Sequence, residues 1–271
     1  MPNHVTHRVI VASANRAALE TFISTFIRVQ DEGGEPCFDF NAVVPMPACI
    51  RNTESSSDVG IGLAMMGRND VPSGFGGSRD IEDYLEYPYY KSQGILTVEA
   101  LVRHVMENNP RVIDAAKNAI KAYEETGHTS WYDWSIANWG TKWNAYSFDP
   151  GEIVEDDNEA GVFTYEFRFD TAWSPPAPVF EVLAGRPEMK EIQLGTIAFD
   201  EGWNFAWMGG IKDGVFEESA LEATKERYAL VYGHEYESDE DEEDEALPSP
   251  VDPNVAQLES TVTALLDAPS Q

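Results

Sequence analysis

An alternating run at residues 163–170 constrains the fold more than any other feature of the chain. Phe163, Tyr165, Phe167 and Phe169 are each followed by a polar residue. Side chains along a strand point alternately to its two faces, so this run predicts one apolar and one hydrated face. Such a strand is typical of an antiparallel sheet packed against a layer of helices.

The N-terminal fifty residues predict a β-α-β unit. Residues 5–12 are rich in β-branched side chains and read as a strand. Residues 15–27 carry a single apolar stripe at helical spacing, and 38–44 read as a second strand. Further along, Thr97 can cap a helix that runs to about 107, and a second helix extends from 110 to Gly127.

The second half predicts a helix after the alternating strand, followed by more strands. A strand is expected at 192–199, and Asp213–Gly214 predicts a tight turn. Ser219 and Glu222 match a capping box, which predicts a final helix that ends near residue 232.

These elements together predict an α+β fold: a split, elaborated ferredoxin-like antiparallel sheet with helices on one face. We expect one domain over 1–233, in which 1–50 is the β-α-β unit, 51–160 is a loop-rich and helical insertion, and 161–233 completes the sheet. The glycines between 60 and 77 fit no nucleotide-binding pattern and predict a flexible loop.

The charge of the chain is strongly acidic and unevenly placed. The sequence holds 48 Asp and Glu against 18 Lys and Arg, for a formal net charge of −30. Residues 234–271 contain 12 of the acidic residues and no Lys or Arg, but the excess persists over 1–233. Such a field repels phosphates and anionic membranes, so we expect no direct nucleic-acid or membrane binding, and a protein partner with a basic surface.

The composition of residues 234–271 predicts an acidic disordered tail. Within it, a short amphipathic helix is possible at 254–267, because several apolar residues share one helical face. We expect this face to contact the body of the protein or a partner through Val255, Leu258, Val262, Leu265 and Leu266.

The chain shows no sign of a metal, a cofactor or a catalytic centre. Cys37 and Cys49 match no metal spacing, and His4 and His7 would point to opposite faces of a strand. No nucleophile elbow or catalytic triad is recognisable. Because the sequence shows no signal peptide and no membrane span, we expect a cytoplasmic protein. Because it shows no catalytic constellation, we expect a protein without enzymatic activity.

Tryptophans make the most individual segment, with four of the seven between residues 131 and 143. They can form an aromatic pocket with polar anchors, together with the corner at 171–176, or they can plug a junction in the core. The pocket hypothesis names these residues: Asn138, Trp139, Gly140, Thr141, Lys142, Trp143, Thr171, Trp173, Pro175 and Pro176.

Several motifs, in order, resemble the Api92-like family, whose C-terminal part is called the YubB ferredoxin-like domain. They are the start MPNHVT, residues 38–47 (FDFNAVVPMP), 139–144 (WGTKWN) and 169–176 (FDTAWSPP). The likeness spans about residues 1–217 and leaves out the acidic tail. It implies a ferredoxin-like fold and a setting on bacteriophages, plasmids or genomic islands of bacteria, but no reaction and no catalytic residue.

The leading functional hypothesis is a phage or plasmid accessory protein that binds a host or phage macromolecule. As an anti-defence inhibitor or nucleic-acid mimic it would occupy a basic site on its partner. Two alternatives stay open: a small-ligand binder or enzyme with a tryptophan-lined pocket, and a virion-associated structural protein.

Overall fold

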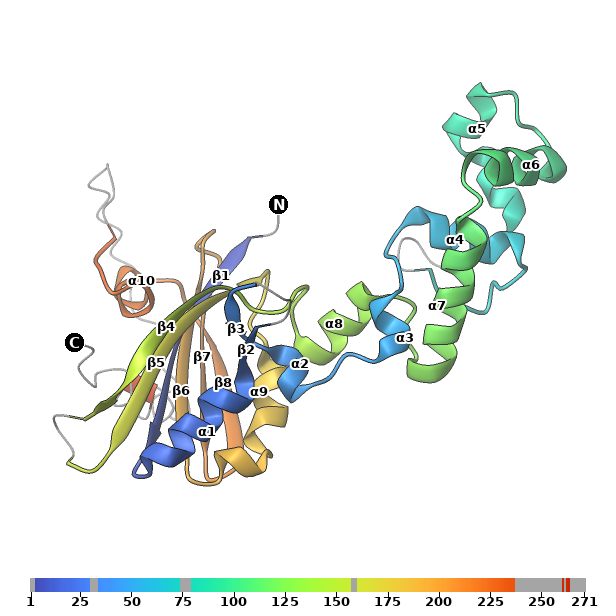
Figure 1. Ribbon diagram of the computed structural model, residues 1–271. Helices are drawn as coiled ribbons and strands as arrows, with labels where there is room; N and C mark the ends of the chain where they lie inside the picture. Colours follow the sequence, from blue (N-terminus) through green and yellow to red (C-terminus); the bar gives the residue numbers. More distant parts are fainter. Residues whose placement is uncertain are drawn as a thin grey trace. The chain divides into compact units, whose positions relative to one another are not determined.

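The computed structural model describes residues 3–29, 34–73, 79–156 and 160–236, together with 260, 262 and 263. The chain divides into two compact units (Figure 1). Unit 1 consists of Met1–Pro45 and Asn138–Gln271, and unit 2 of Met46–Ala137. Unit 2 is shorter than the expected insertion at 51–160, because residues 146–155 form a strand that pairs with the sheet of unit 1.

Unit 1 is built on a six-stranded sheet in the order β4-β5-β1-β6-β7-β8, and every neighbouring pair is antiparallel. The predicted α+β, elaborated ferredoxin-like class is confirmed. The alternating run lies in β5, next to the central strand β1. The bounds are β1 His4–Ser13, β4 Tyr146–Glu155, β5 Phe163–Ala172, β6 Gln193–Asp200, β7 Ala206–Lys212 and β8 Val215–Leu221.

One face of this sheet is covered by α1 (Arg16–Phe26) and α9 (Ala177–Ala184) (Figure 1). Phe22 of α1 and Phe180 of α9 both pack against Phe38, at ring-centroid distances of 6.4 and 6.1 Å. Phe38 in turn lies 5.6 Å from Phe167 of β5. Fully buried aromatic rings therefore form the centre of this layer.

The opposite face is also covered, by α10 (Lys225–Tyr232), so the prediction of helices on one face alone is corrected. Val231 of α10 packs on the sheet with Ile197 and Phe199. Arg8 and Arg168 reach from the strands to the last carbonyls of the helix, those of residues 230 and 231, at 3.1 Å each. These guanidinium groups satisfy acceptors that a helix end leaves open.

Two predicted elements, the strand at 38–44 and the helix start at 219–222, were wrong because local hydrogen bonds stabilise another structure there. The expected strand at 38–44 is split into β3 (Pro36–Phe38), which pairs with β2 (Ile27–Val29), and helix α2 (Phe40–Val43). The Asp39 side chain accepts from the amide of residue 41 and begins that helix. The capping box at 219–222 begins no helix: its first residues pair with β7, and Thr224 caps α10 instead.

Every regular element of unit 2 among its described residues is a helix. Its elements are α3 Ala48–Arg51, α4 Ser57–Met65, the 3₁₀ helix η1 Ile81–Glu86, α5 Pro88–Ser92, α6 Val98–Asn108, α7 Val112–Thr126 and the start of α8 Trp131–Trp139. The two helices predicted after residue 97 are confirmed, with Thr97 as N-cap of α6 and Gly127 in a left-handed conformation after α7.

The glycines at 60 and 62 lie inside α4 and not in the loop that we expected. A Cβ atom at Gly62 would stand 2.2 Å from the carbonyl oxygen of Val112 and 2.8 Å from Cβ of Ala116, both in α7. Glycine therefore allows α4 and α7 to approach closely, and their contact forms a core with Val59 and Leu63. The glycines at 74, 76 and 77 lie outside the described residues.

Candidate functional site

The structure brings together the two segments that the tryptophan hypothesis joined. Thr141 donates to the carbonyl oxygen of Ala172 at 2.8 Å and accepts from the amide of the same residue at 3.1 Å. Ser174 donates to the carbonyl oxygen of Gly140 at 2.5 Å. The segments 139–143 and 171–176 are therefore joined by hydrogen bonds between the hydroxyl groups of Thr141 and Ser174 and the backbone of the opposite segment.

Backbone conformation explains why these segments need particular residues. Gly140 has a φ of 78°, and a Cβ there would stand 2.7 Å from Cδ of Pro178. Trp173 adopts a φ of 74°, which is uncommon for a side chain of its size, and its amide donates to the carbonyl oxygen of Asn3 at 3.0 Å. This strained corner turns the tryptophan away from the core, so its side chain is 40% exposed.

Several of the predicted pocket residues are structural. Trp139 is buried, and its indole N–H donates to the carbonyl oxygen of Val44 at 2.9 Å. Thr141 and Thr171 are buried as well, and Pro176 precedes the first turn of α9. Asn138, near the end of α8, and Pro175, in the corner at 171–176, are both partly exposed.

The exposed members form a compact group, which we call the Trp–Lys–Trp cluster: Trp143, Lys142 and Trp173. The ammonium nitrogen of Lys142 lies 4.6 Å from the ring centroid of Trp143 and 4.9 Å from that of Trp173. Cation–π attraction holds the lysine between the two rings. Because Trp143 is 38% exposed and Trp173 is 40% exposed, the cluster presents both indole rings at the surface.

His7 lies beneath this region and is fully buried against Phe169, with the rings stacked at 4.6 Å. The Thr171 hydroxyl donates to the carbonyl oxygen of Ser174 at 2.9 Å, so it must accept from Nε2–H of His7 at 3.0 Å. Burial lowers the pKa of His7 to about 3. The ring is therefore a neutral part of the core at physiological pH.

Among the described residues, no group of three or more His, Cys, Asp and Glu side chains is arranged to hold a metal ion. His4 contacts Tyr146, whose hydroxyl lies 2.8 Å from His4 Nδ1 and donates to the carbonyl oxygen of residue 171 at 3.0 Å. Burial, helped by Asp170 and Glu201, raises the pKa of Tyr146 to about 12. In the part of the chain that the structure describes, no helix has the length and apolar character needed to cross a membrane.

Among the five predicted tail-contact residues, the structure describes Val262. Val262 lies in a helical segment and is fully buried on the face of the sheet that α10 covers, together with Ile10 and Phe199. The other four predicted tail residues, at 255, 258, 265 and 266, lie outside the described residues.

The two edges of the sheet differ in how open they are. At β4, register shifts at 146–149 and 150–153 and the presence of Pro150 interrupt the ladder, as is common at protected edges. At the other edge, β8 pairs with β7 in an unbroken register, and no further strand pairs with it among the described residues. Strand β8 is therefore the more accessible edge.

The turn before β8 shows which backbone groups face outward. Asp213 and Gly214 have φ values of 52° and 77°, which define a two-residue type I′ turn. The residues that flank such a turn exchange both backbone hydrogen bonds, and the pattern alternates along the ladder. The N–H and C=O groups of Phe216, Glu218 and Ala220 are thus directed to the open side of β8.

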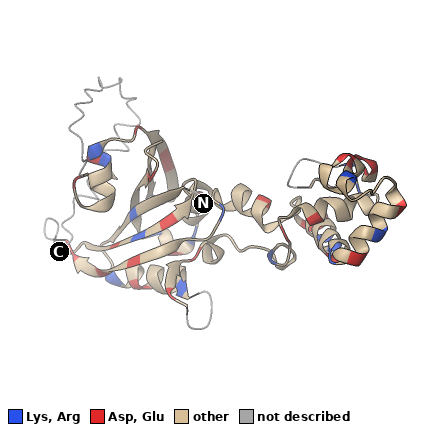
Figure 2. Ribbon diagram, turned by 90° about the horizontal axis from the view of Figure 1, so that it is seen from above, with Lys and Arg blue, Asp and Glu red and all other residues tan. Residues whose placement is uncertain are grey.

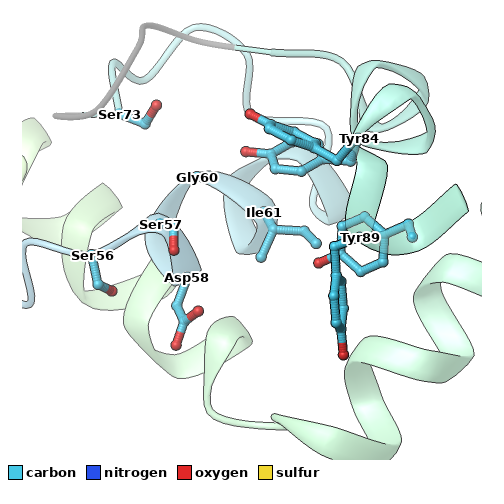
Figure 3. A pocket seen from close by; sticks show the side chains of 10 residues that line it. Ser56, Ser57, Asp58, Gly60, Ile61, Ser73, Tyr84 and Tyr89 are labelled. Carbon is cyan, nitrogen blue, oxygen red and sulfur yellow. The ribbon is translucent and has the colours of Figure 1, made fainter. Parts of the chain in front are cut away.

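A pocket in unit 2 was not predicted from the sequence. It has a volume of about 250 Å³ and lies between the start of α4, η1 and α5 (Figure 3). We call it the tyrosine pocket, and its lining residues are Ser56, Ser57, Asp58, Gly60, Ile61, Ser73, Tyr84, Tyr87, Tyr89 and Tyr90. The four tyrosines within seven residues were a visible signal, but nothing in the sequence showed that they would face the serines of α4.

Comparisons with known proteins add little to this description. No family model and no curated protein matches the sequence. Among solved structures, the chain is similar to a crystal structure of a protein api92 from Yersinia pseudotuberculosis, described as family-model DUF1281. The TM-score is 0.34 at 8% identity, over 83% of this chain and 99% of that chain, which fits a distant relationship at most.

Proposed function

We propose that this chain is a non-enzymatic accessory protein that binds a macromolecule with a basic surface in the bacterial cytoplasm. The sequence motifs that resemble Api92-like proteins favour an origin on a phage, plasmid or genomic island. In that setting, an acidic protein can inhibit a host defence or replication protein by occupying its nucleic-acid site.

The acidity of unit 1 outside the tail carries this proposal. Residues 1–45 and 138–233 contain 23 Asp and Glu against 10 Lys and Arg. Ten cations cannot neutralise 23 carboxylates, so unit 1 keeps a negative field whatever the tail does. Figure 2 shows acidic residues on both the strands and the helices of this unit.

The open edge at β8 is the surface that we assign to the partner. Glu217 and Glu218 lie on it, and Asp213 and Glu222 flank the strand. A second copy of this chain would bring like charges together at this edge, and the tail is acidic too. A basic extended segment of another protein fits the edge better, because its backbone can continue the ladder while its cations meet the carboxylates.

The test is quantitative co-purification from bacterial lysate at low and high salt. We expect the tagged full chain to retain a basic protein at low salt and lose it steeply as ionic strength rises. Glu217→Lys/Glu222→Lys should abolish retention. The control Glu20→Lys/Glu35→Lys makes the same change in net charge away from β8 and should keep most of the retention.

Equal losses in the two double variants would show that only net charge matters, against an interface at β8. Retention of no basic protein at low salt would overturn the proposed function itself.

The Trp–Lys–Trp cluster favours a second candidate, a small-ligand site between the two tryptophan segments. Its rings stay exposed on a hydrogen-bonded support and are not packed in the core. Trp173→Ala would then abolish ligand binding in a metabolite screen while leaving co-purification of the basic partner unchanged. A virion-associated role predicts that the chain is found by mass spectrometry in purified particles.

A further inference from the structure

The lining of the tyrosine pocket combines aromatic faces with a carboxylate. Apart from the phenols, Asp58 is the one ionisable side chain among the lining residues. Its Oδ2 accepts from Nδ2 of Asn109 at 2.6 Å, which fixes the carboxylate at the start of α4. In Figure 3, Asp58 and Ser57 lie on one side of the pocket and Tyr89 on the other, with Ile61 between them.

The four rings provide walls in different directions. Tyr84 and Tyr87 lie 5.4 Å apart at 38°, and Tyr89 and Tyr90 lie 5.2 Å apart at 70°. The guanidinium of Arg79 already lies over the Tyr87 ring, 5.5 Å from its centroid. A ring face of this group therefore attracts a cation within the protein itself.

Tyr84 and Tyr90 keep their phenol protons at physiological pH. Burial raises the pKa of Tyr84 to about 12, and burial, followed by Tyr89 and Asp58, raises the pKa of Tyr90. Neutral phenols keep hydrogen-bonding hydroxyls at the pocket and add no charge of their own.

We propose that the tyrosine pocket binds a small organic ammonium ion, with Asp58 as its counter-ion and the tyrosine rings as its walls. A carboxylate beside aromatic faces favours a cation over a neutral ligand of the same shape. The same carboxylate opposes an anion, although the pocket lies at the N-terminus of α4. A volume of about 250 Å³ suits a compact head group. This inference does not depend on the proposed function, since it concerns another unit.

The chemistry is shared by a free amine and by a methylated lysine side chain, and the experiment separates them. Calorimetric titrations of the full chain would use choline, its neutral carbon analogue 3,3-dimethylbutan-1-ol, inorganic phosphate and a trimethyllysine peptide. We expect choline to bind at least about tenfold more tightly than the neutral analogue, as cation–π attraction predicts. If the trimethyllysine peptide binds more tightly than choline, the natural ligand is a methylated lysine side chain. If the peptide binds more weakly than choline, the natural ligand is a free amine.

Variants test the residues. Asp58→Asn, in which the new side chain can still accept from Asn109, should weaken choline binding about tenfold, whereas the control Asp114→Asn should not. Tyr90→Phe should keep binding within about twofold, and Tyr90→Leu should lose about tenfold. Circular dichroism of each variant checks that the helices are intact.

Equal binding of choline and its neutral analogue would overturn the proposal. So would a preference for phosphate, or no binding of choline to the folded wild type up to its solubility.

Discussion

The contact between α4 and α7 predicts that one added methyl group will loosen unit 2. In Gly62→Ala, the new Cβ would meet the backbone of Val112 at 2.2 Å, well inside van der Waals contact. In Gly60→Ala, the new Cβ would meet the hydroxyl of Tyr84 at 2.7 Å, at the end of a side chain that can move. The two glycines lie in the same helix, so the second variant is a matched control.

The expected difference in stability between the two variants results from two opposing effects. Alanine in place of a helical glycine stabilises either variant by about 1 kcal/mol. At Gly62 the helices must separate by roughly 1 Å to reach normal contact, which weakens the dispersion contacts of the core around Leu63 and Ala119. Overpacking of this kind costs about 1–3 kcal/mol or more. We expect Gly62→Ala to be about 2 kcal/mol less stable than Gly60→Ala.

Hydrogen exchange followed by mass spectrometry measures the stability of α4 and α7 locally. A local measurement is needed because the two units need not unfold together. Peptides from 57–65 and 112–126 should lose roughly 30-fold in protection in Gly62→Ala relative to Gly60→Ala. Equal protection in the two variants would refute the packing that we describe between these helices.

Three further predictions concern unit 1. The pKa of His7 is lower in the folded state, so the unfolded state binds more protons below pH 6.5. His7 should therefore lower the free energy of unfolding by up to about 1.4 kcal/mol per pH unit from 6.5 toward 3. Urea unfolding over this range should show a steeper fall in the wild type than in His7→Phe, and equal slopes would contradict the burial of a neutral His7. Val262→Asp places a charge at a fully buried position on the sheet, so amides near 260–263 should exchange faster; unchanged uptake there would contradict the described contact. Gly140→Ala adds a Cβ at a positive φ, 2.7 Å from Pro178, and should destabilise the chain by about 1–3 kcal/mol in urea unfolding; a variant as stable as wild type would argue against this turn.

Much of the fold could be predicted because its signals are local. Periodic patterns indicated β5 and α1, and Thr97 and Gly127 marked helix ends that the structure confirms. The strand predicted at 38–44 failed because Asp39 offers its own hydrogen bond to the backbone and starts a helix.

Longer-range features were harder to predict. That α10 covers the second face of the sheet depends on Arg8 and Arg168, which lie far from it in the sequence. In the sequence, the glycines of α4 indicated a loop. They are needed because α4 packs closely against another helix, and no local sequence pattern shows that contact.

The tryptophan pocket stays a prediction. The sequence paired the two tryptophan segments, and the structure joins them, but composition could not tell the buried Trp139 from the exposed Trp143. The tyrosine pocket and the open edge at β8 depend on tertiary contacts and register, so both needed the structure.

Hydrogen exchange at β8 in the presence of the co-purified basic partner tests the central claim most directly. We predict that complex formation slows exchange at Phe216, Glu218 and Ala220, whose amides face the open side of the sheet, and that high salt restores the fast rates. Exchange along β8 that is the same with and without the bound partner would contradict a docking role for this edge.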